Sequence, residues 1–384
     1  MSRTASPARR ERRSAATRRK LPILSDVAQQ AAVSLTTASR ALDPDNSHPV
    51  SDRTRARVLA AATRLAYRPN PMARALRTRR VPTIAIVVHD VTDPYFAEIV
   101  RGATAAASSR GFLTVVCSSD RDPLTELRYV EMLSLSRVSG VIFAGGGLDE
   151  AHYRRRMGDY ARSIAHYGGA IVALAPRSER WPAEMPDNRA GARLVTQHLL
   201  ALGHVRIAMI SGPATLRTSR ERELGYLEVM EGAGADAVVV RADFTTAGGA
   251  AAMARLLADR SPSAVFVASD TMALGALAEL RRQGLGVPED VSVAGFDDIP
   301  GLEFIHPRLT TVHVPMAELG AAGVQRLMRY LEGDDTSTTT RLHRANTRWR
   351  SRAGPTIASR SGVRRCRWGH RETLWSSTPR EPPP

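Results

Sequence analysis

Residues Leu24–Leu42 read LSDVAQQAAVSLTTASRAL, a pattern typical of two short helices joined by a tight turn. Ser25 and Ser34 stand near the expected starts of these helices, where a hydroxyl accepts an otherwise unpaired backbone N–H. Small apolar residues let the helices cross closely: Val27, Ala28, Ala31, Val33, Ala38 and Leu42. A third helix would follow Ser51, with the apolar stripe Val58, Ala61, Ala62 and Leu65. The pattern favours a helix-turn-helix domain at residues 21–67; a three-helix bundle without a ligand is the alternative.

The outer face of the second helix carries side chains suited to reading DNA. A helix of this kind fits the major groove, where an arginine such as Arg40 binds guanine O6 and N7 together. Thr37 and Ser39 could instead hold phosphates, which position a helix without reading sequence. The candidate DNA contacts in this segment are Ser34, Leu35, Thr36, Thr37, Ser39 and Arg40.

The positive charge of the chain lies in its two ends and in the helical segment. The 384 residues carry a net charge of +16, with +7 in residues 1–20, +6 in residues 21–80 and +9 in residues 341–384. Residues 81–340 sum to −6. A basic segment before a mildly acidic body predicts one module for a polyanion and one for another ligand. Residues 1–20 show no periodicity and are expected to form a disordered basic tail.

From Thr83 onward, apolar strands alternate with amphipathic helices. The expected strands are 83–88, 113–117, 141–144, 171–174, 207–211, 237–240, 264–268 and 291–296. The expected helices include 96–110, 190–202, 219–231, 272–283 and 315–332. This alternation predicts an α/β body of parallel sheets with helices on both faces.

Segments along the chain match one known pattern in register. In the helical part they are residues 26–42, VSDRTR at 50–55 and YRPNPMARALR at 67–77. In the body they are DPYFAEI at 93–99, DNRAGA at 187–192, MALG at 272–275, GFDD at 295–298 and LTTV at 309–312. Together these segments span residues 24 to about 332, and they resemble the lactose/galactose-repressor (LacI/GalR) family of transcriptional regulators.

The resemblance implies a repressor that binds a palindromic double-stranded DNA operator as a homodimer, under the control of a small-molecule effector such as a sugar. It implies base recognition by Leu35, Thr36 and Arg40, and a hinge helix within residues 68–81. Leu76 matches the wedge leucine of the family, and an apolar wedge between base steps kinks the duplex. A linker residue that packs on its own body is the alternative for Leu76. Phosphate contacts would flank it, at Arg74, Arg77, Arg79 and Arg80.

The resemblance also implies that residues 82–332 form two lobes like those of periplasmic sugar-binding proteins, with the ligand in the cleft. The expected N-lobe is 82–174 with 305–332, and the expected C-lobe is 175–304. Parallel sheets bind ligands beyond the carboxyl ends of their strands, which makes the candidate effector contacts Asp93, Tyr95, Phe96, Arg222, Phe244, Ser269 and Asp297. Arg222 and Asp297 are the strongest of these by resemblance; a surface salt bridge and a loop cap are their alternatives.

The chain departs from the family pattern at three places. Ala32 occupies the inter-helix turn where the family usually has glycine, which suits a left-handed conformation. The loop from Asp43 to Pro49 is longer and more acidic than is typical. Where the family commonly has a ligand-binding aspartate, this chain reads Ala173-Leu-Ala-Pro-Arg177. The third departure leaves the effector open, including a non-sugar ligand or lost binding.

The sequence contains no motif for catalysis or metal binding. It lacks a phosphate-binding loop, a nucleophile elbow and His/Cys metal spacing, so we expect no catalytic residue, metal or cofactor. No apolar stretch reaches the roughly 18–20 residues of a membrane span. Two distant cysteines and no secretory signal favour a cytoplasmic protein. A transport-type sugar-binding protein would share the body but begin with an export signal, and a sugar-processing enzyme would need paired carboxylates in the cleft.

Residues 333–384 break the pattern of the body. A Thr/Ser run leads into an arginine-rich segment that holds Trp349, Trp368 and Trp375, without a readable strand or helix period. A change of reading frame or an appended basic tail would produce such a break. Because like charges with little apolar surface cannot offset the entropy of ordering, we expect a disordered, non-functional extension. Weak nucleic-acid contacts by arginine and tryptophan are the alternative.

Overall fold

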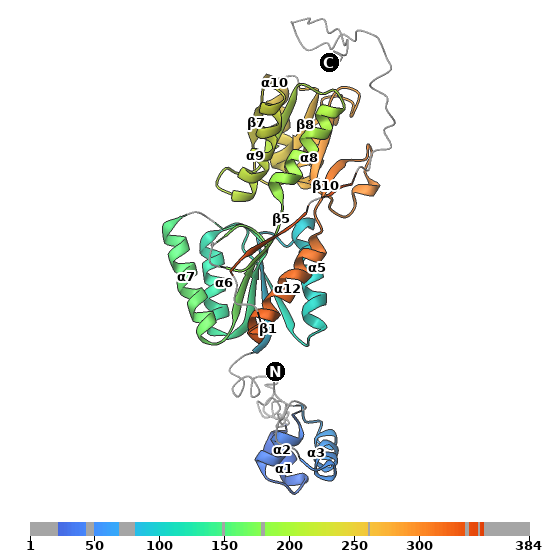
Figure 1. Ribbon diagram of the computed structural model, residues 1–384. Helices are drawn as coiled ribbons and strands as arrows, with labels where there is room; N and C mark the ends of the chain where they lie inside the picture. The colour runs from blue at the N-terminus through green and yellow to red at the C-terminus, as the bar shows by residue number, and fades with distance from the viewer. Residues whose placement is uncertain are drawn as a thin grey trace, which may run out of the picture. The chain divides into compact units, whose positions relative to one another are not determined.

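The computed structural model describes residues 22–43, 50–68, 81–147, 150–177, 181–259, 262–334, 338–344 and 346–348. The chain divides into two compact units, one ending at Val81 and the other beginning at Pro82. The first is all-helical and the second is α/β (Figure 1). The predicted fold class is confirmed.

The first unit consists of α1 (Leu24–Gln30), α2 (Leu35–Ala41) and α3 (Asp52–Arg64). Their small apolar side chains form one core: Val27, Ala28, Ala31, Ala38, Ala41, Val58, Ala61 and Ala62. Ser34 and Ser51 cap α2 and α3 as predicted, accepting the backbone N–H groups of Thr37 and Thr54. The predicted cap at Ser25 is wrong. Ser25 lies inside α1, and the Asp26 carboxylate instead accepts from the N–H of Ile23 at the start of that helix, at 2.9 Å.

The first lobe of the second unit surrounds a six-stranded sheet in the order β11-β5-β4-β3-β1-β2. Its strands are β1 (Val81–Val88), β2 (Leu113–Ser118), β3 (Val138–Phe143), β4 (Ala170–Ala173), β5 (Ala183–Pro186) and β11 (Thr340–His343). Its helices are α5 (Pro94–Ser108), α6 (Pro123–Leu135), α7 (Ala151–His166) and α12 (Met316–Glu332). Figure 1 shows α5 and α12 on one side of this sheet, with α6 and α7 on the other. Along β1, Ile84 and Ile86 join the core under α5 and α12, whereas Ala85 and Val87 join the core under α6 and α7.

The second lobe surrounds another six-stranded sheet, in the order β12-β10-β9-β8-β6-β7. Its strands are β6 (Ile207–Ser211), β7 (Val238–Arg241), β8 (Ala264–Val267), β9 (Ser292–Asp297), β10 (Thr310–His313) and β12 (Asn346–Arg348). Its helices are α8 (Asn188–Ala201), α9 (Arg217–Gly232), α10 (Thr246–Asp259), α11 (Asp270–Arg282) and the short 3-10 helix Leu302–Phe304. Helix α8 packs against α9, and α10 packs against α11. Strands β6 to β10 pair in parallel, so their carboxyl ends share one edge.

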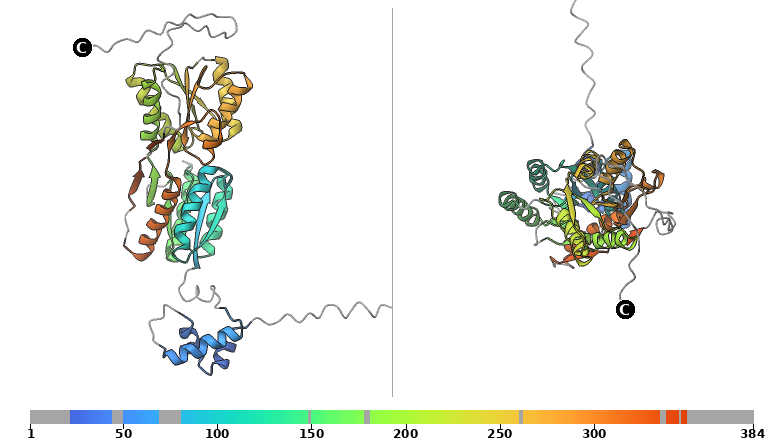
Figure 2. Two further views of the ribbon diagram at one scale, coloured as in Figure 1. Left: turned by 90° about the vertical axis from the view of Figure 1, so that its right-hand side faces the viewer. Right: turned by 90° about the horizontal axis from the view of Figure 1, so that it is seen from above.

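The chain passes between the two lobes after β5, after β10 and after β11 (Figure 2). The predicted lobe boundaries were wrong at two of these passages. Strand β5 belongs to the first sheet, although residues 175–304 were assigned to the C-lobe, and β10 belongs to the second, although 305–332 were assigned to the N-lobe. The sequences of these two strands, AEMP and TTVH, contain polar residues and a proline, so neither has the apolar run that marked the other strands.

The prediction of a structureless chain from Gly333 onward is wrong for residues 340–348. Strand β11 pairs in parallel with β5, and β12 pairs antiparallel with β10. The backbone of each strand is therefore bonded at the edge of a sheet, which requires no apolar side chains. The rest of the arginine-rich tail, from Trp349, lies outside the described residues.

Candidate functional site

The side of α2 away from the core presents most of the residues predicted to read DNA. Leu35, Thr36 and Arg40 are exposed, with 53% of the Leu35 surface accessible. Ser34, at the start of the helix, accepts from the Thr37 N–H at 3.1 Å, and the two hydroxyls lie 2.8 Å apart. The outer side of α2 thus offers an apolar, a hydroxyl and a guanidinium group together.

The turn before α2 is fixed by a contact that the sequence did not predict. Ala32 has a φ of 49°, the left-handed conformation that glycine adopts more easily. Arg57 of α3 donates to the carbonyl oxygens of Ala31 at 3.0 Å and Ala32 at 3.3 Å. These bonds satisfy carbonyls at the end of α1 and tie the turn to α3.

The other predicted DNA contacts lie partly outside the described residues. Thr37 and Ser39 are half-buried on α2. The hinge, with the predicted contacts Arg74, Leu76, Arg77, Arg79 and Arg80, falls within residues 69–80, which the structure does not describe. The roles assigned to these residues stay predictions.

All of the predicted effector contacts line one cavity between the lobes. The first lobe contributes Asp93, Tyr95 and Phe96, and the second contributes Arg222, Phe244, Ser269 and Asp297. The cavity volume is about 70 Å³, well below the roughly 300–1,000 Å³ of typical small-molecule sites. A sugar-sized ligand therefore needs the lobes or the rim side chains to move apart.

The second lobe supplies a buried ion pair to the cavity wall. Arg222 on α9 donates from Nη2 to Asp297 Oδ1 at 3.0 Å and from Nε to Asn188 Oδ1 at 2.9 Å. Its Nη1 donates to the carbonyl of Ala268, and its guanidinium lies 3.7 Å from the ring centroid of Phe296. Arg222 is thus locked in place, and Asp297 is held at the end of β9 with a φ of 116°.

Burial makes the cavity carboxyl groups easier to protonate. Burial raises the pKa of Asp297 to about 7; Arg222 opposes this shift and Asp93 adds to it. Asp93, which caps α5, accepts from the Tyr95 N–H at 3.1 Å and from the Thr271 hydroxyl of the other lobe at 3.5 Å. Burial also raises the pKa of Asp93. Two hydrogen-bonding carboxyl groups therefore face the cavity, one from each lobe.

His89, which the sequence analysis did not single out, completes the aromatic part of the wall. It follows β1 and is 6% exposed, and its ring packs edge-on against that of Phe96, with 5.6 Å between the ring centroids. Its Nε2 lies 3.0 Å from the carbonyl of Gly146, an acceptor, so Nε2 carries the proton. Burial, together with the nearby charges of Arg121 and Arg177, lowers the pKa of His89 to about 4. His89 is therefore a neutral group at pH 7.

The rim of the cavity also contains Arg121, which the sequence analysis missed. Arg121 follows β2 in the first lobe, and its guanidinium lies 5.5 Å from the Phe244 ring centroid in the second. Ser269 lines the same cavity, but its hydroxyl caps α11 by accepting from Met272 N at 3.2 Å. The rule that selected Asp93 and Asp297, a position just beyond the carboxyl end of a strand, applies equally to His89 and Arg121.

The departure at Ala173–Arg177 gives a buried cation instead of an acidic ligand contact. Arg177 donates to Glu126 through Nη1 at 2.6 Å and Nη2 at 3.0 Å, to the Tyr153 hydroxyl at 2.8 Å and to the Gly145 carbonyl at 2.6 Å. Its guanidinium lies 4.3 Å from the Phe143 ring centroid. Burial alone would raise the pKa of Glu126, but Arg177 outweighs it, so the net shift is downward. Arg177 thus fixes the loop that forms one side of the cavity.

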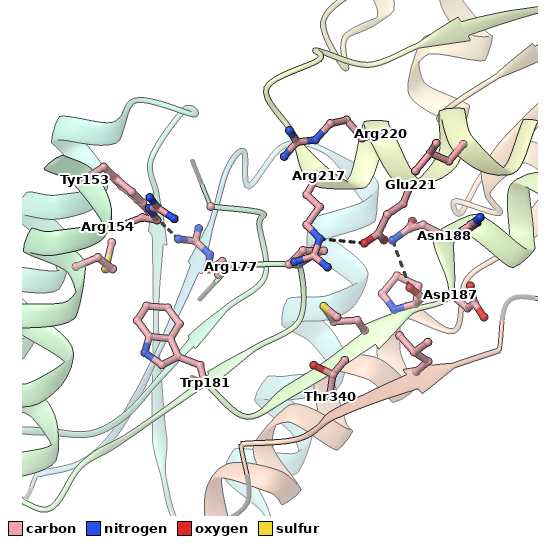
Figure 3. A pocket seen from close by; sticks show the side chains of 18 of the residues that line it. Tyr153, Arg154, Arg177, Trp181, Asp187, Asn188, Arg217, Arg220, Glu221 and Thr340 are labelled. Carbon is pink, nitrogen blue, oxygen red and sulfur yellow. Dashed lines mark hydrogen bonds and ion pairs between the residues drawn. The ribbon is translucent and has the colours of Figure 1, made fainter. Parts of the chain in front are cut away.

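A larger, open groove of about 1120 Å³ lies beside this arginine. Figure 3 shows Arg217 and Arg220 reaching toward it from α9, with Tyr153 and Arg154 on α7 at the other side. Arg217 is paired with Glu221 at 3.2 Å. The groove is lined by residues far apart in the chain, and no local pattern in the sequence predicted it.

Two further observations concern membranes and metals. No helix among the described residues combines the length and the apolar character needed to cross a bilayer. In the same part of the chain, no group of three or more His, Cys, Asp or Glu side chains is arranged to hold a metal ion.

The two units match two protein-family models. Residues 23–70 match the model of bacterial regulatory proteins of the lacI family. Residues 196–353 match the periplasmic binding protein-like domain. The second match extends through β11 and β12, which agrees with their place in the two sheets.

Similar proteins match over both units. The chain is 34% identical over 325 residues to the HTH-type transcriptional repressor CytR of Escherichia coli (strain K12), covering 83% of this chain and 92% of CytR. A lac repressor dimer bound to operator and the anti-inducer ONPF is similar with a TM-score of 0.75 and 28% identity, over 85% of this chain and 98% of that one. The transcriptional regulator CelR in complex with cellobiose is similar with a TM-score of 0.62 and 33% identity, over the same shares. The chain belongs to the lacI family of bacterial regulatory proteins.

Proposed function

We propose that this DNA-binding transcriptional regulator represses its target genes as a homodimer on an inverted-repeat operator. We further propose that a carbohydrate-type effector, bound in the cleft between the lobes, controls the affinity of the protein for that operator. The observation that carries the proposal is the combination of an exposed reading face on α2 with a buried, two-sided polar cleft in the body.

The DNA half of the proposal rests on α2. Leu35, Thr36 and Arg40 would face the base edges, with Arg40 placed to bind guanine through two hydrogen bonds. A single helix of this length contacts only a few base pairs, so a dimer that reads two half-sites is the expected arrangement. The lac repressor structure is that of a dimer bound to operator.

The effector half rests on the chemistry of the cleft. Sugar hydroxyls donate to carboxylates and accept from guanidinium groups, while sugar C–H faces pack on aromatic rings. Asp93, Asp297 and Arg222 supply the polar groups, and Tyr95, Phe96 and Phe244 supply the rings. CelR, which is similar over 85% of this chain, was solved with cellobiose.

The same contacts favour binding over catalysis. Asp297 is bonded to Arg222, and Asp93 to Tyr95 N and Thr271, so both carboxyl groups are held as fixed acceptors. We therefore propose that the cleft carries out no reaction. A regulator acts where its operator DNA lies, so the proposed site of action is the cytoplasm.

Two experiments test this function. The full-length protein first selects its preferred sequence from random DNA duplexes, and its binding to the selected duplex is then measured by gel shift at increasing concentrations of sugars. The expected result is an inverted repeat bound by two chains, and at least one sugar that changes the affinity at least tenfold. A single asymmetric half-site bound by one chain would refute the dimer. A ligand whose effect is unchanged in Asp297→Ala would refute its placement.

A further inference from the structure

Arg121 is a charged side chain in the cleft without a bonded counterpart. It lines the cavity and stacks on Phe244 at 5.5 Å. Within the described residues, its guanidinium makes no hydrogen bond, and no carboxylate oxygen lies within 4.0 Å of its nitrogens. The other cavity arginine, Arg222, is in contrast bonded to Asp297, Asn188 and Ala268.

The backbone around Arg121 is held in an unfavourable conformation. Asp120 and Arg121 have φ angles of 49° and 61°, in the left-handed region that residues with a Cβ seldom adopt. The turn is kept by Ser119 N donating to the Val88 carbonyl at 3.0 Å and Asp122 N donating to the Ser119 carbonyl at 2.8 Å. Strained residues of this kind cluster at ligand sites, where the fold holds a side chain for use.

The electrostatic surroundings of Arg121 differ from those of Arg177. Burial lowers the pKa of Arg121, and the nearby carboxylates Asp93, Asp90 and Asp243 offset this only in part. At Arg177 burial acts in the same direction, but Glu126 outweighs it and the pKa is raised. The positive charge of Arg121 is half-buried and is only partly balanced by the carboxylates of the protein. Such a charge attracts a negatively charged group of a ligand.

We infer that the effector carries an anionic group, a carboxylate or a phosphate, that binds Arg121 while its hydroxyl groups bind Asp93 and Asp297. This inference rests on the proposed function, in which the cleft holds the effector. The planar guanidinium matches both anions with two parallel hydrogen bonds. The ligand class is therefore an acidic or phosphorylated sugar.

The test compares melting temperatures of the full-length wild type with Arg121→Gln, Arg121→Lys and Arg220→Gln. Arg220 is an exposed arginine of the outer groove and serves as the matched control. Two simple anions, inorganic phosphate and acetate, serve as the first probes. Two sets of sugars follow: glucose with glucuronate and glucose 6-phosphate, and ribose with ribose 5-phosphate. Phosphate and the sugar phosphates test for a phosphate site, whereas acetate and glucuronate test for a carboxylate site.

We expect a saturable rise in melting temperature with either phosphate or acetate in wild type and Arg220→Gln, a smaller rise in Arg121→Lys, and none in Arg121→Gln. The best anionic sugar should bind Arg121→Gln at least tenfold more weakly, while any binding of its neutral form is unchanged. Equal responses of wild type and Arg121→Gln, no response of the wild type, or neutral sugars that bind as tightly as their anionic forms would overturn the inference. A different result would refute the proposed function: no sugar would change the affinity for the operator, even if the response to anions depended on Arg121.

Discussion

Arg222 on α9 and Asp297 at the end of β9 form an ion pair with 3.0 Å between Nη2 and Oδ1, and at most 6% of either side chain is exposed. The pair belongs at once to the core of the second lobe and to the wall of the cleft. A buried ion pair recovers its desolvation cost only when further hydrogen bonds satisfy both partners. Asn188 and Ala268 provide these bonds for Arg222, so the arginine holds the Asp297 carboxyl in position before any ligand arrives.

Asp297 should make the folded protein less stable as the pH rises between about 4 and 7. Burial raises its pKa from 3.8 to about 7, so over this range the folded state holds a proton that the unfolded state releases. Below pH 7 Arg222 therefore donates to a neutral carboxyl group, and the contact becomes an ion pair only as the pH rises through 7. The stabilising contribution is fully present below the unfolded pKa and is lost as the pH rises through 7. This contribution is measured by comparing the melting temperatures of wild type and Asp297→Asn at pH 5, 6, 7 and 8.

The advantage of wild type over Asp297→Asn should shrink with pH, by at most about 4 kcal/mol across the window. Asp297 also raises the pKa of its buried neighbour Asp270, so the difference between the two proteins reports the titration of Asp297 together with its effect on Asp270. A difference that is constant from pH 5 to 8 would show that the carboxyl is ionised throughout.

Arg40→Ala should weaken operator binding by roughly 1–3 kcal/mol and relax base preference at one position per half-site. The reason is the loss of a two-bond contact to a guanine edge. Arg64→Ala, which removes an exposed arginine at the end of α3, is the matched control and should leave base preference unchanged. Affinity measured on the selected operator and on single-base variants decides the matter. Equal loss on every sequence would place Arg40 on a phosphate instead.

Glu126→Gln should destabilise the body by about 3–5 kcal/mol, because it leaves the Arg177 charge buried without a counter-charge. Tyr153→Phe is the matched control: it removes one hydroxyl from the same cluster but leaves the ion pair, so a loss of about 1 kcal/mol is expected. Thermal or urea unfolding of the three proteins gives the comparison. Equal losses in the two variants would mean that the charge of Glu126 contributes little.

Much of this architecture could be predicted from the sequence, because the deciding signals are local. The cap at Ser34 follows from one hydroxyl before an apolar helix pattern, and most cleft residues follow from their positions near strand ends. Arg222 lies within α9 and was predicted from the family resemblance. The Glu126–Arg177 pair could not be found this way, since 51 residues separate its members. Strands β5, β10 and β11 were missed because backbone pairing, and not an apolar run, defines them.

The final prediction concerns the C-terminal strands. Ending the chain after Gly333 should lower the melting temperature of the body by about 10 °C or more, whereas ending it after Arg348 should leave it unchanged. The shorter form loses β11 and β12, which pair with an edge of each sheet, and with them the third passage between the lobes. A loss of several kcal/mol shifts the melting temperature of a body this size by that amount.

Side-chain contacts add to the loss in the shorter form. Arg326 on α12 is fully buried and donates to the Thr339 hydroxyl at 3.2 Å, and His343 Nε2 lies 2.8 Å from Glu184 Oε2. If the shorter form does not fold, Arg326→Met in the full-length chain should still lower the melting temperature, while His343→Ala, at a half-buried site, should lower it less. Equal melting temperatures for the two truncated forms would show that β11 and β12 contribute nothing to stability. The boundary between the folded body and the arginine-rich extension would then lie at Gly333, as the sequence pattern alone predicts.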